Sequence, residues 1–188
     1  MQKNNTIQEK LWLIGIESGV SDFHSIKQFL STEGIEFGRF ELNKLAHEYA
    51  KPNTISDSQR IQLLSSFPEI SEKYSNKRGY RADVVCLYPD FEHIAMVMKM
   101  FGDVHYHFEN EFWYFFDGRL GFTFYSQKGF KFNVIMEAGQ YIQVPEKIWQ
   151  QCFFVEPGDR MKSMRCCTTT GTVVLPKISF EEKRESCS

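Results

Sequence analysis

The fold is decided by the stretch Val104-His-Tyr-His-Phe-Glu-Asn-Glu-Phe-Trp-Tyr-Phe-Phe-Asp-Gly-Arg-Leu-Gly-Phe-Thr-Phe-Tyr125. Aromatic residues are concentrated here, and they are typical of strands because rings pack well on a half-buried pleated surface. We expect a strand at Val104–Phe108. Two more, Glu111–Phe116 and Leu120–Tyr125, are expected on either side of a tight turn at Asp117-Gly118. The stretch therefore indicates antiparallel β structure.

Strand signals continue beyond this stretch in both directions, as far back as Tyr80. Ala82–Tyr88 is an apolar run, and Phe91–Phe101 predicts a short helix with Asp90 as its N-cap. Turn signals separate the strands by about 8–12 residues, a spacing typical of a sandwich or a barrel. The later strands are expected at Phe130–Met136, Tyr141–Val144, Cys152–Val155, Met161–Thr169 and Thr172–Leu175.

The chain before Tyr80 is partly helical. Asp22 precedes an apolar stripe from Phe23 to Leu30, which predicts a helix. Ser56 and Gln59 have the spacing of a capping box and predict the start of another helix. The hydrophobic period changes near Tyr80 and divides the chain into residues 1–79 (an N-terminal layer of helices and a strand in the same domain), 80–176 (a barrel) and 177–188 (a polar tail).

Composition narrows the class of protein. Lys and Arg number 22 and Asp and Glu 24, so the net charge of −2 provides no strong positive field for nucleic acid. No stretch approaches the roughly 18 apolar residues of a membrane helix. The polar start predicts no secretory signal, and the five cysteines include no Cys-x-x-Cys pair. We therefore expect a cytoplasmic protein with reduced thiols that binds neither nucleic acid nor membrane.

The strongest chemical signal is His105-x-His107 followed by Glu111. On a strand the two histidines would project from the same face, and a turn at Asn110 would bring Glu111 beside them. Two imidazoles and one carboxylate form the ligand set of mononuclear Fe(II) sites with open positions. The alternative interpretation is a pair of solvent-facing histidines on a loop. Three further histidines are expected at the surface without such partners: His24, His47 and His93.

A second motif completes a resemblance to a known family. Gly139–Pro145 has the spacing glycine, five residues, proline, which is found in the second motif of cupin barrels. Together with His105, His107 and Glu111 it makes the chain resemble the acireductone dioxygenase family.

The resemblance extends into the N-terminal layer. Ile26–Phe40 is similar to the family's helix and following strand, and Gly79–Val85 is similar to its Gly-Tyr…Asp-Val segment. It covers the chain from about Trp12 to Thr170. It implies a mainly β cupin barrel (a double-stranded β-helix or jelly roll) with an N-terminal α/β layer packed outside.

The family implies a cytosolic enzyme that binds Fe(II) or Ni(II) and cleaves the enediol acireductone of methionine salvage with dioxygen. With iron the products are formate and a 2-keto acid; with nickel the cleavage releases carbon monoxide. The partners are a small-molecule substrate and O₂, and we expect a monomer or a small homo-oligomer.

The chain departs from the family at two positions. The family's fourth ligand is a histidine, and Gln150 occupies that position here, with an amide oxygen that is a weaker donor than imidazole. Trp113 stands where the family has an arginine, and Arg165 corresponds to a second family arginine. We expect Gln150 to be a fourth ligand and Trp113 and Arg165 to contact substrate. These changes predict a more loosely held metal and slow turnover of acireductone itself.

Two other functions fit the same motifs. One is a different cupin enzyme that uses a three-ligand site on another small molecule, and the other is a non-catalytic cupin that binds a small molecule or a partner. Bound metal in the purified protein would argue against the non-catalytic alternative.

Overall fold

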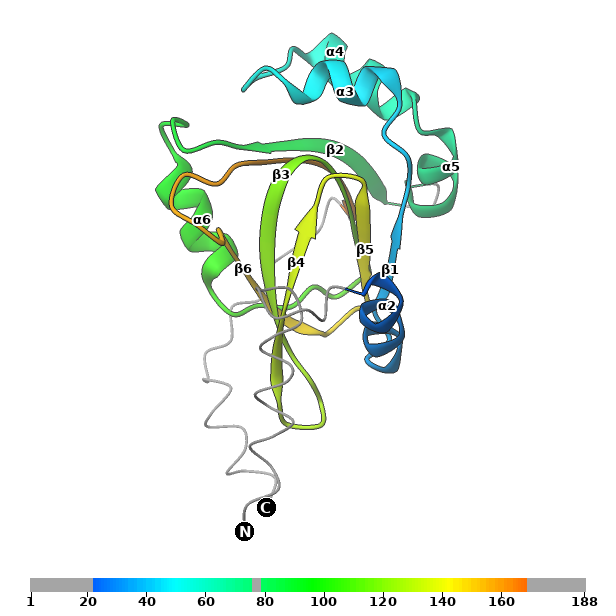
Figure 1. Cartoon of the computed structure of the whole chain (residues 1–188), viewed down its shortest axis with the longest axis vertical. Coiled ribbons are helices and arrows are strands. Elements are labelled where there is room, and N and C mark those ends of the chain that lie inside the picture. The colour runs from blue at the N-terminus through cyan, green and yellow to red at the C-terminus, as the bar shows by residue number, and fades with distance from the viewer. Residues whose placement is uncertain (1–21, 76–78, 169–188) are drawn as a thin grey trace.

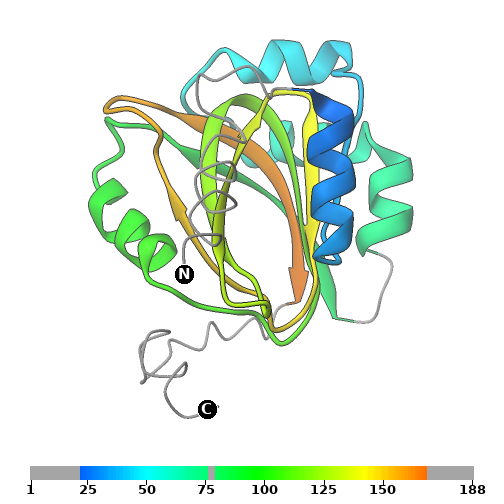
Figure 2. The same ribbon diagram turned by 60° about the horizontal axis from the view of Figure 1, so that its bottom comes forward.

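One long strand, β3 (Glu111–Tyr125), passes through the whole sheet of the computed structural model, which describes residues 22–75 and 79–168 (Figure 1). Within these residues the sheet has seven strands in the order β1-β5-β3-β7-β2, and β4 and β6 also pair with β3. Every pair is antiparallel. Figure 2 shows the strands curving around a common interior. The other strands are β1 (Glu36–Arg39), β2 (Tyr80–Leu87), β4 (Lys131–Glu137), β5 (Gln140–Val144), β6 (Trp149–Phe153) and β7 (Met161–Thr168).

The predicted turn at Asp117-Gly118 is wrong, because β3 continues through both residues. The register between β3 and β7 shifts between Phe115 and Asp117, so Phe116 is the extra residue of a bulge that bends the strand just before the Asp-Gly pair. The first half of β3 pairs with β5 and β7, and the second half pairs with β4 and β6. Gly118 has φ +67°, and a Cβ there would lie 1.7 Å from the Arg160 carbonyl oxygen. The strand therefore requires glycine at this position, two residues after the bulge.

Gly118→Ala should destabilise the fold strongly. The positive φ alone costs an L-residue roughly 1 kcal/mol, and the clash is with backbone, which cannot rotate away. We expect a loss of about 3 kcal/mol or more in the free energy of unfolding, measured by urea denaturation. Gly158→Ala is the matched control: its φ is +89°, but nothing lies within 4 Å of the added Cβ. That variant should lose only about 1 kcal/mol, and equal losses in the two would contradict the packing argument.

The helices lie outside the barrel (Figure 1). Asp22 caps α2 by accepting hydrogen bonds from two backbone N–H groups, and Ser56 and Gln59 form a capping box on α4, as predicted. The predicted Asp90 cap of α6 is wrong: the helix begins at Ile94, and Asp90 accepts a hydrogen bond from Asn53 instead. The bounds are α2 (Phe23–Thr32), α3 (Lys44–Ala50), α4 (Asp57–Ser65), α5 (Pro68–Ile70), the π-helix η1 (Ser71–Ser75) and α6 (Ile94–Gly102).

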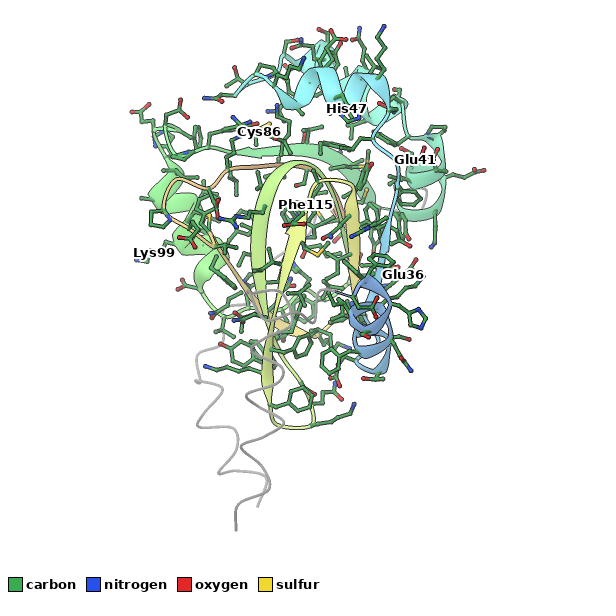
Figure 3. All side chains as sticks on the ribbon, in the orientation of Figure 1. Glu36, Glu41, His47, Cys86, Lys99 and Phe115 are labelled. Atoms are coloured by element: carbon green, nitrogen blue, oxygen red, sulfur yellow. The ribbon has the colours of Figure 1, made fainter. Side chains whose placement is uncertain are left out.

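Alternation along β3 builds two cores. Trp113 and Phe115 face the barrel interior, whereas Phe112 and Tyr114 face outward and pack on the N-terminal layer, for example against Phe67. Figure 3 shows Phe115 among the strands and His47 on the outer helices. The outer layer therefore shares a buried apolar interface with the barrel.

The predictions for the C-terminal part of the chain can be compared with the structure only as far as residue 168. β6 begins at Trp149, so the predicted strand Cys152–Val155 starts too late. The predicted strand Thr172–Leu175, the barrel end at residue 176 and the polar tail lie outside the described residues. In the part of the chain that the structure describes, no helix has the length and apolarity needed to cross a membrane.

Candidate metal centre

The segment from Val104 to Asn110 carries the two histidines and is not the predicted strand. Only an isolated bridge forms, in which His105 and Gln150 exchange backbone hydrogen bonds of 2.9 and 2.8 Å. The next contact is a 2.7 Å bond from Lys147 N to the His107 carbonyl. Although it is irregular, the segment is therefore fixed to β6 and to the loop before it.

The structure brings His105, His107, Glu111 and Gln150 together inside the barrel. The two imidazole centroids are 5.2 Å apart, and His107 Nε2 lies 3.5 Å from Glu111 Oε2. Gln150 Nε2 donates a 2.9 Å hydrogen bond to the same oxygen. None of the four residues is more than 7% exposed. The cluster is thus buried and combines groups from three segments of the chain.

Hydrogen bonding and burial constrain the two imidazoles. His105 Nδ1 lies 2.7 Å from the Asp103 carbonyl oxygen, which can only accept, so Nδ1 donates this hydrogen bond and Nε2 is left for another partner. Burial lowers the pKa of His107, and the opposing effect of Glu111 does not outweigh it. A neutral imidazole is the form that ligates metal ions.

Glu111 is ionised despite complete burial. Burial alone would raise the pKa of this carboxyl, but chiefly the charge of Arg165 lowers it to about 2. Arg165 Nε donates a 2.6 Å hydrogen bond to Glu111 Oε1, and Arg165 Nη2 contacts the same oxygen. Oε1 is therefore occupied by the guanidinium, and Oε2 is turned toward His107 and Gln150.

Trp113 lies beside this ion pair, on the same face of β3 as Glu111. Its side chain is buried, and the Arg165 guanidinium lies 5.0 Å from its ring centroid and 5.7 Å from that of Phe101. Sequence reasoning expected both Trp113 and Arg165 to contact substrate. It missed the direct pairing of Arg165 with Glu111, which depends on strand register, and the contribution of Phe101, which depends on how α6 packs on the sheet.

The donor set fits a divalent metal ion. His107 Nε2 and Gln150 Oε1 are buried and have no hydrogen-bond partner in the structure, and such orphaned atoms are costly unless something binds them. Among the described residues, no three His, Cys, Asp or Glu side chains already surround one point closely enough to hold an ion.

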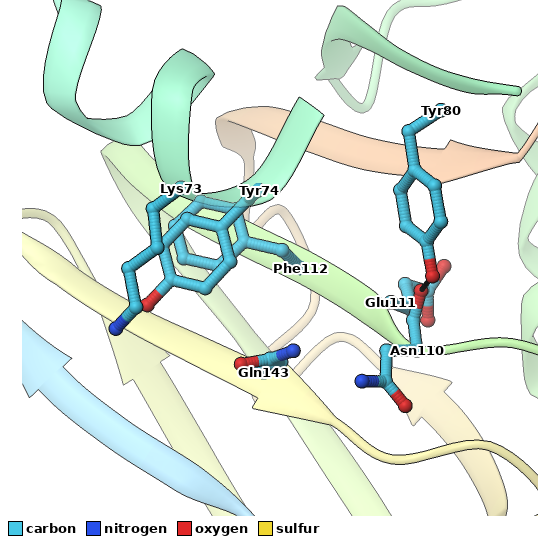
Figure 4. Close-up of a pocket in the computed structure, with 7 residues that line it drawn as sticks. All are labelled: Lys73, Tyr74, Tyr80, Asn110, Glu111, Phe112 and Gln143. Carbon is cyan, nitrogen blue, oxygen red and sulfur yellow. Dashed lines mark hydrogen bonds between the residues drawn. The ribbon is translucent and has the colours of Figure 1, made fainter. Parts of the chain in front are cut away.

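A surface depression lies nearby but is a different feature. It has about 210 Å³ of space that is partly open to solvent, between η1 and the start of β2 (Figure 4). Of the four clustered residues only Glu111 contributes to its lining, which also includes Lys73, Tyr74, Tyr80, Asn110, Phe112 and Gln143.

The three remaining histidines, His24, His47 and His93, are exposed, as predicted. The described cysteines, Cys86, Cys152, Cys166 and Cys167, are free thiols, and Cys187 lies outside the described residues.

Comparison with known proteins gives a consistent set of relatives. No protein-family model matches the chain. Acireductone dioxygenase of Leptospira interrogans is 26% identical over 149 residues, which span 78% of this chain and 82% of the relative. Acireductone dioxygenase of Bacillus cereus is 24% identical over 156 residues, spanning 82% and 91%.

The fold is also shared with a solved structure. Acireductone dioxygenase from Bacillus anthracis, with a cadmium ion in its active centre, superposes with a TM-score of 0.71 at 20% identity. The superposition covers 80% of this chain and 88% of that chain. The predicted fold, a mainly β cupin barrel with an N-terminal layer outside, is confirmed.

Proposed function

We propose that this chain, a divergent relative of the acireductone dioxygenases, is a metal-dependent dioxygenase that cleaves an enediol-type small molecule with O₂. The reaction would belong to methionine salvage or a related pathway. The supporting observation is the buried cluster of His105, His107, Glu111 and Gln150. Two atoms of this cluster that could bind a metal ion, His107 Nε2 and Gln150 Oε1, have no hydrogen-bond partner.

His105, His107 and Glu111 would hold the ion, with the Gln150 carbonyl as a fourth ligand. Fe(II) suits this mixture of imidazole and oxygen donors, and Ni(II) is the second candidate. When bound, such an ion supplies Lewis acidity and redox chemistry that the side chains lack. The side chains supply position, a dry environment and charge. The free thiols of the described cysteines fit a reducing compartment such as the cytoplasm.

The aromatic walls shape what the cluster can accept. Trp113 and Phe101 are T-shaped to each other at 6.0 Å and enclose the Arg165 guanidinium. Arg165 already donates to Glu111, so less of its charge is available to a dianionic substrate. These contacts favour a planar enediol that carries less negative charge than doubly ionised acireductone.

Oxygen uptake tests the proposed activity. The full-length protein, loaded anaerobically with Fe(II), should consume O₂ when an enediol is added, and a chelator should stop the consumption. A panel of enediols of decreasing charge, with acireductone included, should give its lowest rate with acireductone. Metal binding without O₂ uptake for any enediol would instead favour a non-catalytic cupin. Uptake confined to other small molecules would favour a different cupin enzyme.

A further inference from the structure

We infer that Trp113 and Arg165 are positioning residues for the Glu111 carboxylate, an inference that rests on the proposed metal site. The Trp113 ring packs against the Arg165 guanidinium, and the guanidinium binds Oε1 of Glu111. The other oxygen, Oε2, is thereby held toward His107 and Gln150. Trp113, through Arg165, and Gln150 then act on the same carboxylate.

The first of these contacts is the hydrogen-bonded ion pair between Arg165 and Glu111. Two guanidinium nitrogens contact the single oxygen Oε1. Glu111 is 2% exposed, so water does not compete for the carboxylate. An arginine fork holds a carboxylate in a defined orientation, which a lysine cannot do equally well.

The second step is the orientation of the remaining oxygen. Oε2 lies 3.5 Å from His107 Nε2 and accepts the Gln150 amide at 2.9 Å. Two ligands about 2.0–2.2 Å from one ion lie roughly 3–3.5 Å apart, so the His107–Glu111 spacing is already that of a ligand pair. Groups that orient a metal ligand in this way commonly change metal affinity by about 10–100-fold.

The third step is the support of Arg165 by Trp113. The two residues are direct partners in the β3–β7 register, and the guanidinium lies 5.0 Å from the indole centroid. A cation near the face of a buried indole is attracted by the ring, and a leucine would not replace that attraction. Loss of the indole should therefore leave Arg165 free to turn away from Glu111.

The Co²⁺ affinity of variants shows whether Trp113 and Arg165 act by positioning Glu111 or only by the charge of Arg165. The probe is Co²⁺, titrated calorimetrically into the full-length protein. Trp113→Leu changes no charge, yet it should weaken Co²⁺ binding by about 10-fold or more. Arg165→Met should also weaken binding, although it removes a positive charge that repels the ion, and Arg165→Lys should recover part of the loss. In the Arg165→Met background, Trp113→Leu should cause a smaller loss than in the wild type, with the remainder due to the direct effect of Trp113 on Glu111.

Phe115→Leu is the matched control for lost packing. Phe115 is equally buried on the same face of β3, and its ring contacts are with Trp113 and Phe122. It should lose stability to a similar extent but keep Co²⁺ affinity within about twofold of the wild type. Wild-type affinity in Trp113→Leu, tighter binding in Arg165→Met, or an equal loss in Phe115→Leu would each overturn the inference while leaving the metal site intact. If the wild type itself binds no Co²⁺, Mn²⁺ or Fe(II), the proposed function fails as well.

Discussion

Replacing His105 or His107 by alanine is expected to abolish most metal binding. Each imidazole is buried, His105 is held by a hydrogen bond through Nδ1, and His107 Nε2 has no hydrogen-bond partner. Loss of a direct ligand should exceed the roughly 10–100-fold effect of groups that only orient ligands. Metal content after equilibrium dialysis against Fe(II), measured by elemental analysis, checks this result.

The control for the histidine variants is His47→Ala. His47 is exposed on α3, outside the barrel (Figure 3), so its loss should leave the metal content unchanged. Circular dichroism would show that the histidine variants remain folded. Unchanged metal content in both His105→Ala and His107→Ala would rule out this site.

Gln150→His is expected to tighten metal binding. The side chain enters the cluster from β6, directly beside His105, and both glutamine and histidine are neutral. Imidazole is a stronger donor than an amide oxygen toward Fe(II) or Ni(II), and its second nitrogen can still donate a hydrogen bond. The dissociation constant for Co²⁺, compared with that of the wild type, gives the direction of the change. Weaker Co²⁺ binding in the variant would show that the site holds the metal better with the Gln150 amide than with an imidazole at the same position.

Adding Trp113→Arg to Gln150→His should raise turnover of acireductone. A new guanidinium can make a charge-assisted hydrogen bond to an ionised enediol, worth about 1.5–3 kcal/mol or roughly 10- to 150-fold. Because the loss of the indole frees Arg165, the rate has to be measured at saturating Fe(II). If the wild type already turns over acireductone at a rate ordinary for enzymes, about 1–10³ per second, then Gln150 and Trp113 do not slow the reaction.

The layout of the barrel could be predicted from hydrophobic period, but the path of β3 could not. Asp117-Gly118 has the composition of a hairpin turn, and no neighbouring residue signals otherwise. The bulge forms because both flanks keep their partners on β7, where Phe115 pairs with Ser163 and Asp117 with Lys162. Pairing between strands far apart in the chain decides this conformation, and a local pattern does not contain it.

The candidate site divides in the same way. The spacing of His105, His107 and Glu111 is local, so sequence reasoning could name them together. The contact between Arg165 and Glu111 follows from the register that places Arg165 opposite Trp113, which only the folded chain defines. The start of α6 is predicted a few residues too early. Asp90 does not cap this helix, because its side chain accepts a hydrogen bond from Asn53, which is far away in the sequence.

We expect one metal ion to bind to His105, His107 and Glu111. An anomalous difference map from crystals grown with Fe(II), recorded at the iron edge, tests it most directly. We expect a single peak inside the barrel, about 2.0–2.2 Å from both histidine Nε2 atoms and from a Glu111 oxygen. A peak elsewhere, or no peak in protein that retains stoichiometric iron, would contradict it.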